Sequence, residues 1–347
     1  MKIFVSGGAG FIGSNFIRYI LKKHKNVRIL NYDKLTYSGN LDNLKDTAKD
    51  KRYQFKRGDV EEREHLTKIL KEFKPDYIVN FAAETHVDRS IHIGAKEFID
   101  TNITGVFNIL EIVKANPKIK NYLQVSTDEV YGSLDLNSKE KFEEDTAFAP
   151  NVPYAATKAS GDMLCRAYYN TFGVPVVVTH CSNNYGPYQY PEKLTPFLIL
   201  RMLENKKLPI YGDGRNVRDW IYVLDHCEAL RLCLFGSRPG EIYNIGADNE
   251  MNNLEIAGLI LKYFNRDKSW IEFVGDRPGH DRRYAVDSSK IRKELGWKPK
   301  YKFKEAFKQT IDWYIKNKKW VDNVRKKTGV FNPHIDLWKA HQLKSKR

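Results

Sequence analysis

The sequence predicts an α/β protein with a doubly wound parallel sheet and a smaller α/β C-terminal lobe. Two observations predict it. In the first half of the chain, short apolar strands alternate with helices of ten residues or more, a rhythm typical of parallel sheets covered by helices on both faces. A glycine-rich turn joins the first strand to the first helix. Right-handed crossovers then place the carboxyl ends of all strands on one rim, where ligands bind.

The composition is that of a globular protein. At 347 residues, with 41% hydrophobic and 29% charged residues, the chain can form one large domain or two modest ones. No run of about 18 apolar residues is present, so no membrane span is expected. The first residues form a strand and a turn rather than a signal-peptide pattern, and the four cysteines contain no CxxC pair. We therefore expect a cytoplasmic protein with reduced thiols.

The net charge of +15 results from 58 basic and 43 acidic residues. An excess of this size raises the possibility of nucleic-acid binding. However, the lysines are spread along the chain and mixed with Asp and Glu, and the densest part, 298–327, has helical patterns. We expect a solvated surface without a nucleic-acid partner, and the charge suits an anionic substrate.

The first strand, 2–6, leads through Gly7, Gly10 and Gly13 into an apolar-periodic helix at Phe11–Lys23. Glycines at this spacing allow a tight turn and let a pyrophosphate approach the helix N-terminus, whose free N–H groups favour anions. This strand, turn and helix form a Rossmann-type nucleotide-binding unit.

The second strand, Val27–Tyr32, ends in Asp33, twenty residues after Gly13. A carboxylate at this position can accept hydrogen bonds from the ribose hydroxyls of NAD. It favours NAD over NADP, although Lys34 and Arg57 leave NADP open.

The alternation continues with a strand at Tyr53–Lys56, a helix at Glu62–Phe73 and a strand at Tyr77–Phe81. The latter opens into Ala82 and Ala83, whose small side chains let a cofactor lie close to the backbone. A long helix is expected at Ala95–Asn116.

The next strand begins at Tyr122 and ends in a hydroxyl and two carboxylates, Thr127, Asp128 and Glu129. Acids at a ligand-binding rim are candidates for chemistry. Adjacent residues of a regular strand point to opposite faces, so both acids can serve one substrate only if the chain turns there. The alternative is one buried acid beside one surface acid.

A polar loop at 133–151 precedes a helix that Pro153 opens in its first turn. Tyr154 and Lys158 are four residues apart and so lie on one face of that helix. A phenol has a pKa of about 10. A lysine ammonium and a nicotinamide cation lower it, which would make Tyr154 a general base toward an alcohol. Alternatively, this is an ordinary helix with an aromatic residue and a lysine.

After a strand at Val174–Cys181 the rhythm changes to shorter elements, which we assign to the smaller lobe. Polar clusters at Arg215–Asp219 and 276–283 could bind phosphate through arginine, or could be solvated turns or internal salt bridges. The expected strands are Pro209–Tyr211, Glu241–Ile245 and Ile271–Val274, and the expected helices are Thr195–Asn205, Val223–Phe235, Asn253–Phe264, Ser288–Leu295 and Lys304–Lys316.

The glycine turn, Asp33, Asp59, Ala82-Ala83 and the Tyr154/Lys158 pair together resemble the extended short-chain dehydrogenase/reductase family. The resemblance runs from residue 1 to about residue 320 and narrows to the dTDP-glucose 4,6-dehydratases of that family. His180 stands where these dehydratases usually have Arg, and Ser6 where the wider family often has Thr. The stretches that carry the narrower resemblance are 33–40, 83–90, 126–132, 181–189, 191–194, 218–220 and 276–281.

The resemblance implies a lyase that uses bound NAD to convert dTDP-glucose to dTDP-4-keto-6-deoxyglucose, a step toward deoxysugars such as rhamnose. Tyr154, supported by Lys158, would take the C4 hydroxyl proton while the C4 hydride passes to NAD. Glu129 would then remove the C5 proton, and Asp128 would protonate the departing C6 hydroxyl. Thr127 would hydrogen-bond the C4 oxygen, and the hydride would return to C6.

The resemblance also implies the binding residues, a homodimer through the helices near 95–116 and 154–172, and no metal. We expect an NAD-binding domain at 1–185, to which some later segments return, a nucleotide-sugar lobe at 186–330 and a basic tail at 331–347. The residues implied for NAD are Gly7, Gly10, Phe11, Ile12, Gly13, Asp33, Lys34, Leu35, Thr36, Asp59, Val60, Phe81, Ala82, Ala83, Thr101, Tyr154, Lys158 and Asn184. Those implied for the nucleotide sugar are Thr85, Thr127, Asn183, Lys193, Leu194, Pro209, Ile210, Tyr211, Arg218, Asn253, Asp276, Arg277 and His280.

Three alternatives stay open. The enzyme could act on UDP- or CDP-glucose, because the base is recognised in the C-terminal lobe. It could be a nucleotide-sugar 4-epimerase, although such relatives tend to carry Ser or Thr in place of the Asp128-Glu129 pair. More remotely, the chain could be a non-catalytic relative that binds nucleic acid.

Overall fold

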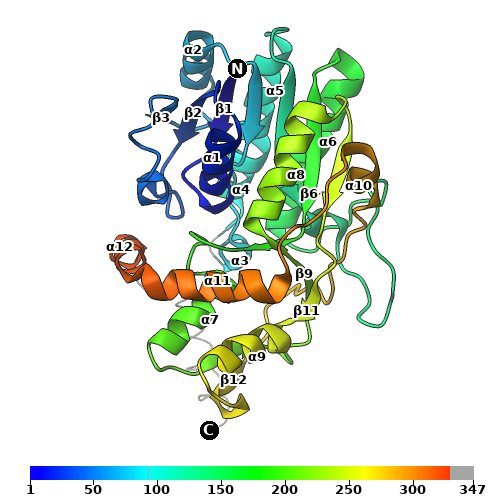
Figure 1. Ribbon diagram of the computed structural model, residues 1–347. Helices are drawn as coiled ribbons and strands as arrows, with labels where there is room; N and C mark the ends of the chain where they lie inside the picture. The colour runs from blue at the N-terminus through cyan, green and yellow to red at the C-terminus, as the bar shows by residue number, and fades with distance from the viewer. Residues whose placement is uncertain (93, 329–347) are drawn as a thin grey trace.

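A seven-stranded sheet, parallel throughout, forms the centre of the larger lobe in the computed structural model, which describes residues 1–92 and 94–328 (Figure 1). The strand order is β10-β6-β5-β4-β1-β2-β3. The predicted α/β class with a parallel sheet is therefore confirmed. The strands are β1 (Lys2–Ser6), β2 (Arg28–Asp33), β3 (Tyr53–Arg57), β4 (Tyr77–Asn80), β5 (Asn121–Thr127), β6 (Val176–Cys181) and β10 (Ile242–Ile245).

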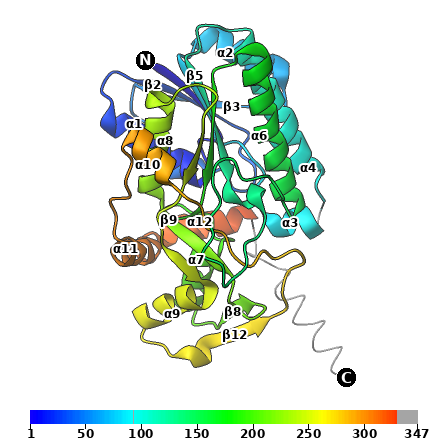
Figure 2. The same ribbon diagram turned by 90° about the vertical axis from the view of Figure 1, so that its right-hand side faces the viewer.

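Successive strand residues point to opposite faces, and each face is buried under its own helices. Ile3 and Val5 of β1 belong to a core shared with α1, α8 and α10. Phe4 between them belongs to a second core with α2, α5 and α6. Figure 2 shows these two helix layers on either side of the sheet. The helices are α1 (Phe11–Lys23), α8 (Val223–Gly236), α10 (Ser289–Leu295), α2 (Arg63–Phe73), α5 (Val106–Lys114) and α6 (Pro153–Phe172).

The helix expected at 95–116 is divided into three parts: α4 (Lys96–Ile99), a π-helical turn (Asp100–Gly105) and α5. In the wider turn, Asn102 accepts a hydrogen bond from the Glu84 N–H at 3.0 Å and donates one to the Glu84 carbonyl at 3.1 Å. Thr101 donates to Glu61 at 2.7 Å. These bonds from neighbouring segments stabilise a turn that sequence periodicity does not reveal. A short helix before it, α3 (Val87–His92), was not predicted.

The smaller lobe packs below the rim of the large sheet (Figure 1). It contains a two-stranded parallel sheet, β12-β8, and a three-stranded sheet, β11-β9-β7, around an aromatic-rich core. Its elements are β7 (Asn183–Tyr185), α7 (Leu194–Leu203), β8 (Leu208–Tyr211), β9 (Val217–Tyr222), β11 (Glu250–Asn252), α9 (Asn253–Tyr263), β12 (Ile271–Val274), α11 (Phe303–Lys316) and α12 (Lys318–Thr328). Short 3₁₀ turns lie at Leu41–Leu44, Asp128–Tyr131 and Lys268–Trp270.

Three elements that we assigned to the smaller lobe belong to the larger one. The strand expected at 241–245 is β10, which extends the large sheet beside β6, and the helices expected at 223–235 and 288–295 are α8 and α10, which pack against that sheet. In the cluster at 215–219, whose role was left open, β9 begins at Val217 and the Asp219 side chain is buried, accepting hydrogen bonds from the backbone N–H groups of Ala247 and Asn249.

The domain division at residue 185 stays a prediction, and the tail at 331–347 lies outside the described residues. None of the described helices combines the length and apolar character that a membrane crossing requires.

Candidate active site

Two adjoining cavities lie at the carboxyl ends of the sheet strands, where the smaller lobe meets them. The first has a volume of about 290 Å³ and is lined by residues that follow β1, β2, β4, β5 and β6. The second has a volume of about 180 Å³ and is lined mainly by the smaller lobe. Six residues line both cavities, so the two cavities adjoin at these side chains. The shared residues are Glu129, Asn183, Asn184, Gln189, Glu192 and Lys193.

The glycine turn leaves no room for side chains. Gly7 has a φ of +70°, and a Cβ there would lie 2.4 Å from the Ala82 nitrogen. A Cβ on Gly13 would lie 2.5 Å from the Gly7 oxygen. The turn therefore brings the N-terminus of α1 to the cavity with bare backbone facing it, which fits a pyrophosphate. At the end of β2, the two oxygens of buried Asp33 accept hydrogen bonds from Ala9 N–H and Leu35 N–H, each at 2.8 Å.

Lys34, which had left NADP open, is paired with carboxylates. Its Nζ lies 2.5 Å from Asp59 and 3.5 Å from Glu61. These two carboxylates already pair with Lys34, which makes it a poor partner for a second phosphate on the ribose.

All but one of the residues predicted for NAD line the first cavity. The exception is Leu35, which has a left-handed φ of +59° and contributes only its N–H to Asp33. Those that line it are Gly7, Gly10, Phe11, Ile12, Gly13, Asp33, Lys34, Thr36, Asp59, Val60, Phe81, Ala82, Ala83, Thr101, Tyr154, Lys158 and Asn184.

The chain does turn at the two acids. β5 ends at Thr127, whose Oγ1 caps a 3₁₀ turn that begins at Asp128, accepting from Glu129 N–H at 3.3 Å. Residues of a 3₁₀ turn are rotated by about 120° from one another instead of alternating between two faces. As a result, Asp128 lines the first cavity and Glu129 lines both.

The two carboxyl groups have unequal environments. Burial, and then the charge of Glu129, raises the pKa of Asp128 well above its ordinary value. Burial also raises the pKa of Glu129, but the charges of Arg218, Lys193 and Arg277 oppose it. Asp128 Oδ2 is buried without a hydrogen-bond partner. This pair therefore favours a protonated Asp128 beside an ionised Glu129.

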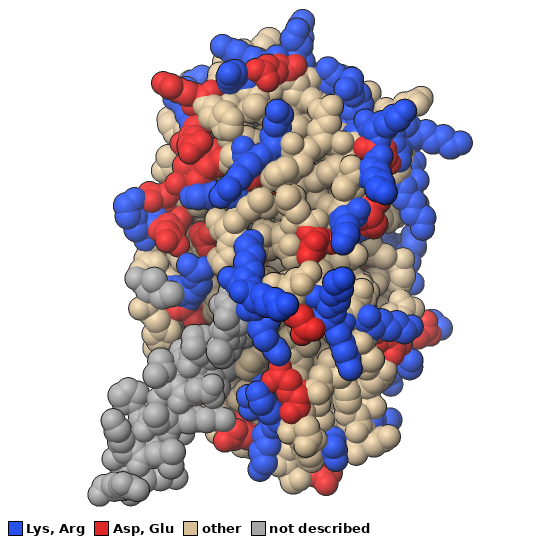
Figure 3. All heavy atoms as spheres, turned by 90° about the vertical axis from the view of Figure 1, so that its left-hand side faces the viewer, with Lys and Arg blue, Asp and Glu red and all other residues tan. Residues whose placement is uncertain are grey.

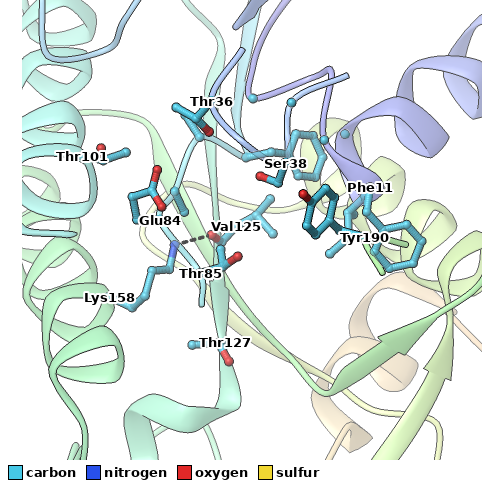
Figure 4. Close-up of a pocket in the computed structure, with 18 of the residues that line it drawn as sticks. Phe11, Thr36, Ser38, Glu84, Thr85, Thr101, Val125, Thr127, Lys158 and Tyr190 are labelled. Atoms are coloured by element: carbon cyan, nitrogen blue, oxygen red, sulfur yellow. Dashed lines mark hydrogen bonds between the residues drawn. The ribbon is translucent and has the colours of Figure 1, made fainter. Parts of the chain in front are cut away.

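Tyr154 and Lys158 project from the first two turns of α6 into the first cavity. Figure 4 shows Lys158 reaching from α6 toward β5, where its Nζ donates to the Val125 carbonyl at 2.8 Å. In the protein alone, burial and then the charge of Glu129 raise the pKa of Tyr154, and burial lowers the pKa of Lys158. The lowering of the phenol pKa by Lys158 and a nicotinamide cation together stays a prediction.

His180 stands where the dehydratases of the resemblance usually have Arg. Here it belongs to a buried hydrogen-bond network with Asp162 and Tyr131. Its Nε2 lies 3.2 Å from Asp162 Oδ2, and its Nδ1 lies 2.7 Å from the Tyr131 hydroxyl. Ser126 donates to the same Asp162 oxygen at 2.5 Å. Asp162 is one turn beyond Lys158 on α6, and its charge raises the pKa of that lysine. The histidine is thus fully hydrogen-bonded and helps to hold the acid that faces Lys158.

Most residues predicted for the nucleotide sugar line the second cavity. Thr85 and Thr127 line the first cavity instead. Asp276 lines neither cavity. Its Oδ1 lies 2.6 Å from His280 Nδ1, so it orients that imidazole from outside the second cavity. Those on the second cavity are Asn183, Lys193, Leu194, Pro209, Ile210, Tyr211, Arg218, Asn253, Arg277 and His280.

The sequence analysis did not select two further acids. Glu84 and Glu192 line the first cavity, and burial raises the pKa of each to about 7. Glu192 accepts from the Tyr37 hydroxyl at 3.2 Å and lies 3.4 Å from His86 Nε2. Both stand inside stretches that carry the resemblance, Glu84 in 83–90 and Glu192 in 191–194, so that match could have identified them.

The described residues include no group of His, Cys, Asp and Glu side chains arranged to hold a metal ion.

Replacing Asp128 by Asn is expected to stabilise the protein while damaging the site. A carboxyl group whose folded pKa exceeds its unfolded pKa binds more protons when folded, so its contribution to stability falls as the pH rises above about 4. Asn has the same shape and no charge. We expect a gain of about 0.5–2 kcal/mol near neutral pH, shrinking toward about pH 5. Denaturant unfolding across this range measures it, and an equal or greater gain at the lower pH would contradict the raised pKa.

A family model described as GDP-mannose 4,6 dehydratase matches residues 4–310. A dTDP-glucose 4,6-dehydratase of Salmonella typhimurium is 44% identical, over 97% of this chain and 98% of the relative.

Two solved structures are similar throughout. The dTDP-glucose 4,6-dehydratase of Bacillus anthracis, in complex with NAD, is 49% identical with a TM-score of 0.87, over 93% of this chain and 99% of that one. The dTDP-glucose 4,6-dehydratase DesIV of Streptomyces venezuelae, also with NAD bound, is 43% identical with a TM-score of 0.89, over 93% of this chain and 100% of that one. The chain therefore belongs to the dTDP-glucose 4,6-dehydratase family.

Proposed function

We propose that the chain converts dTDP-glucose to dTDP-4-keto-6-deoxyglucose with loss of water, using bound NAD. The observation that carries this proposal is the turn after β5, which presents Asp128 and Glu129 to one cavity beside Tyr154 and Lys158. Elimination of water needs an acid and a base in addition to the group that takes the C4 hydroxyl proton, whereas inversion at C4 needs only that last group.

The first cavity fits NAD. The N-terminus of α1 behind Gly7 and Gly13 would hold the pyrophosphate, and Asp33 would hold a ribose. When bound there, NAD would accept a hydride from C4 of the sugar and return it at C6. Two solved relatives carry NAD, which supports the same cofactor here.

Tyr154 is the group placed to take the proton of the C4 hydroxyl. Burial, and then the charge of Glu129, raises its pKa in the protein alone. An oxidised nicotinamide beside the ring would supply a positive charge and lower the pKa of the phenol. Lys158, held on the Val125 carbonyl, and the Thr127 hydroxyl would steady the C4 oxygen as its charge changes.

A ketone at C4 acidifies the C5 proton, which Glu129 would remove and which must be replaced at C5 when the hydride enters at C6. Asp128, kept protonated by burial and by the charge of Glu129, would donate its proton to the departing C6 hydroxyl. Glu129 is assigned as the base and Asp128 as the acid because three cationic side chains act on Glu129 and favour its ionised form. Arg218, the first of these, is fixed by a hydrogen bond to the Asp281 carbonyl at 3.0 Å and lies over the Tyr284 ring at 4.1 Å.

The choice among nucleotide bases rests on the relatives, which are named for dTDP-glucose although the family model is described for GDP-mannose. The acid pair argues against a 4-epimerase. For nucleic acid, Figure 3 shows Lys and Arg interspersed with Asp and Glu on the face drawn, instead of one continuous basic surface. This distribution favours a small anionic substrate.

The test is incubation of the protein with dTDP-glucose, UDP-glucose and CDP-glucose separately. We expect the mass of dTDP-glucose to fall by one water, at a kcat/KM at least tenfold above the other two. No water loss from any of the three would overturn the dehydratase assignment. Preference for UDP- or CDP-glucose would overturn only the choice of base.

We also infer a homodimer through the outer face of α4, α5 and α6. Each of these helices exposes at least one large apolar side chain: Ile99 on α4, Phe107 on α5, and Met163, Tyr169 and Phe172 on α6. Exposed apolar side chains on adjacent helices are typical of an interface, and two copies of a helix pair can form a four-helix bundle.

Met163→Arg is expected to convert the dimer to a monomer, because a charge would be buried between the two copies of α6. Light scattering during gel filtration measures the mass. Phe273→Arg, a similar change at an exposed apolar residue of β12, is the control and should leave a dimer. A wild-type monomer, or an unchanged mass for Met163→Arg, would exclude this interface.

A cytoplasmic location is proposed from the chemistry: the four cysteines are free and buried, and NAD and nucleotide sugars are metabolites of that compartment.

A further inference from the structure

The last described helix, α12, is anchored in the smaller lobe. Trp320, Val321 and Val324 are buried in the aromatic core of that lobe. The Trp320 ring packs against Trp313 of α11 at 5.1 Å between ring centroids, and against Tyr188 at 5.9 Å. The packing of this apolar face fixes the position of α12, and with it the position of the polar side chains on the rest of the helix.

The polar side of α12 reaches across to the larger lobe. Trp320 Nε1 donates to Asn43 Oδ1 at 2.8 Å, and both side chains are buried. Asn323 donates to Asp42 at 3.0 Å. Lys327 Nζ donates to the Gly39 carbonyl at 2.6 Å and the Thr36 carbonyl at 3.1 Å. Residues 320, 323 and 327 lie on one helix face, so all four bonds hold the same segment.

That segment, 34–44, is part of the wall of the first cavity. Thr36, Ser38 and Gly39 line the cavity, and Figure 4 shows Thr36 and Ser38 on one side of it. The segment folds around Asp33, since a Cβ on Gly39 would lie 2.8 Å from Asp33 Oδ1. Apart from one short 3₁₀ turn it has no regular structure, so side-chain contacts must hold it in place.

The other contacts of the segment lead to the glycine turn. Asn43 Nδ2 donates to the Ala9 carbonyl at 2.8 Å, and Asn40 N–H donates to the same carbonyl at 3.0 Å. Asn43 therefore connects Trp320 of α12 to the turn proposed for the pyrophosphate. Lys327 also acts electrostatically on Asp33, where its charge opposes the rise in pKa that burial causes.

We infer that α12 is a clasp that retains NAD, with Trp320, Asn323 and Lys327 as positioning residues that hold segment 34–44 over the adenosine end of the cofactor. The inference rests on the proposed function in one respect. A reaction that returns its hydride to the substrate leaves the cofactor unchanged, so the cofactor has no need to leave between turnovers. A clasp supplied by the substrate lobe would slow its release.

Two variants remove bonds between α12 and segment 34–44, and only Trp320→Phe changes the packing of the core. Trp320→Phe keeps an aromatic ring and loses the N–H donor to Asn43, and Lys327→Met keeps the aliphatic chain and loses both bonds to the segment. Lys326→Met, at an exposed neighbour on the same helix, is the matched control. Lys327→Met alone keeps the test informative if Trp320→Phe fails to fold.

The measurement is the release rate of NADH, followed by its fluorescence after a chase with excess NAD⁺. We expect release about tenfold faster in the double variant, and a few-fold faster in Lys327→Met. With saturating NAD and dTDP-glucose, kcat and the sugar KM should stay within about twofold of wild type. The control should match wild type.

Unchanged NADH release in both variants would overturn the clasp. So would a fall in kcat at saturating NAD with unchanged release, because α12 would then support the chemistry and not the cofactor. Release is measured without turnover, whereas failure of the proposed function would appear as absence of water loss by the wild-type protein.

Discussion

Glu129→Gln is expected to keep slow oxidation at C4 while water loss falls by about 10²–10⁴-fold. The amide preserves the shape of the side chain but cannot accept the C5 proton. Tyr154 and Lys158 remain in place to remove the C4 hydroxyl proton. Reduced nicotinamide should therefore accumulate on the enzyme, because the sugar is oxidised and cannot proceed.

Single-turnover absorbance of the reduced nicotinamide, together with mass analysis of the sugar nucleotide, separates these two steps. Glu144→Gln is the matched control. Glu144 is a part-buried glutamate outside both cavities, and its carboxylate accepts a hydrogen bond from Asn244 N–H at 2.9 Å that an amide oxygen can replace. Normal water loss by Glu129→Gln would exclude Glu129 as the base.

Tyr154→Phe is expected to stop the reaction one step earlier. Without the phenol oxygen no group on α6 takes the C4 hydroxyl proton, so kcat should fall by about 10³–10⁴-fold and no reduced nicotinamide should accumulate. The absence of reduced nicotinamide distinguishes Tyr154→Phe from Glu129→Gln. The same absorbance and mass measurements apply.

Tyr185→Phe is the control for loss of a buried phenol, since the Tyr185 hydroxyl lies in the smaller lobe and outside both cavities. It should retain near-normal turnover. Reduced nicotinamide in Tyr154→Phe at the wild-type rate would show that another group accepts the proton.

The features that could be predicted from the sequence are those that depend on the spacing of neighbouring residues. The glycines follow a strand at intervals of three residues because the turn and the pyrophosphate both need bare backbone there. Tyr154 and Lys158 share a face because they are one helical turn apart. Such patterns involve a few neighbouring residues, so they are visible before folding.

The features that could not be predicted depend on partners far along the chain. Asp219 looks like a surface acid in the sequence and is buried because backbone N–H groups nearly thirty residues later bind it. Glu192 acquires a raised pKa from burial at the junction of the lobes, beside Tyr37. The turn at Asp128 could be predicted only in part. The residue types Asp128 and Glu129 indicated a catalytic role, but that both line one cavity follows from the 3₁₀ turn, which the sequence did not reveal.

The central claim is an internal redox cycle in which one hydrogen moves from C4 to C6 of the same sugar. The most direct measurement uses dTDP-glucose deuterated at C4 and examines the product by mass spectrometry and NMR. We expect a product that has lost one water and carries the deuterium on C6. A dehydrated product with no deuterium, or deuterium retained at C4 of an undehydrated sugar, would contradict it.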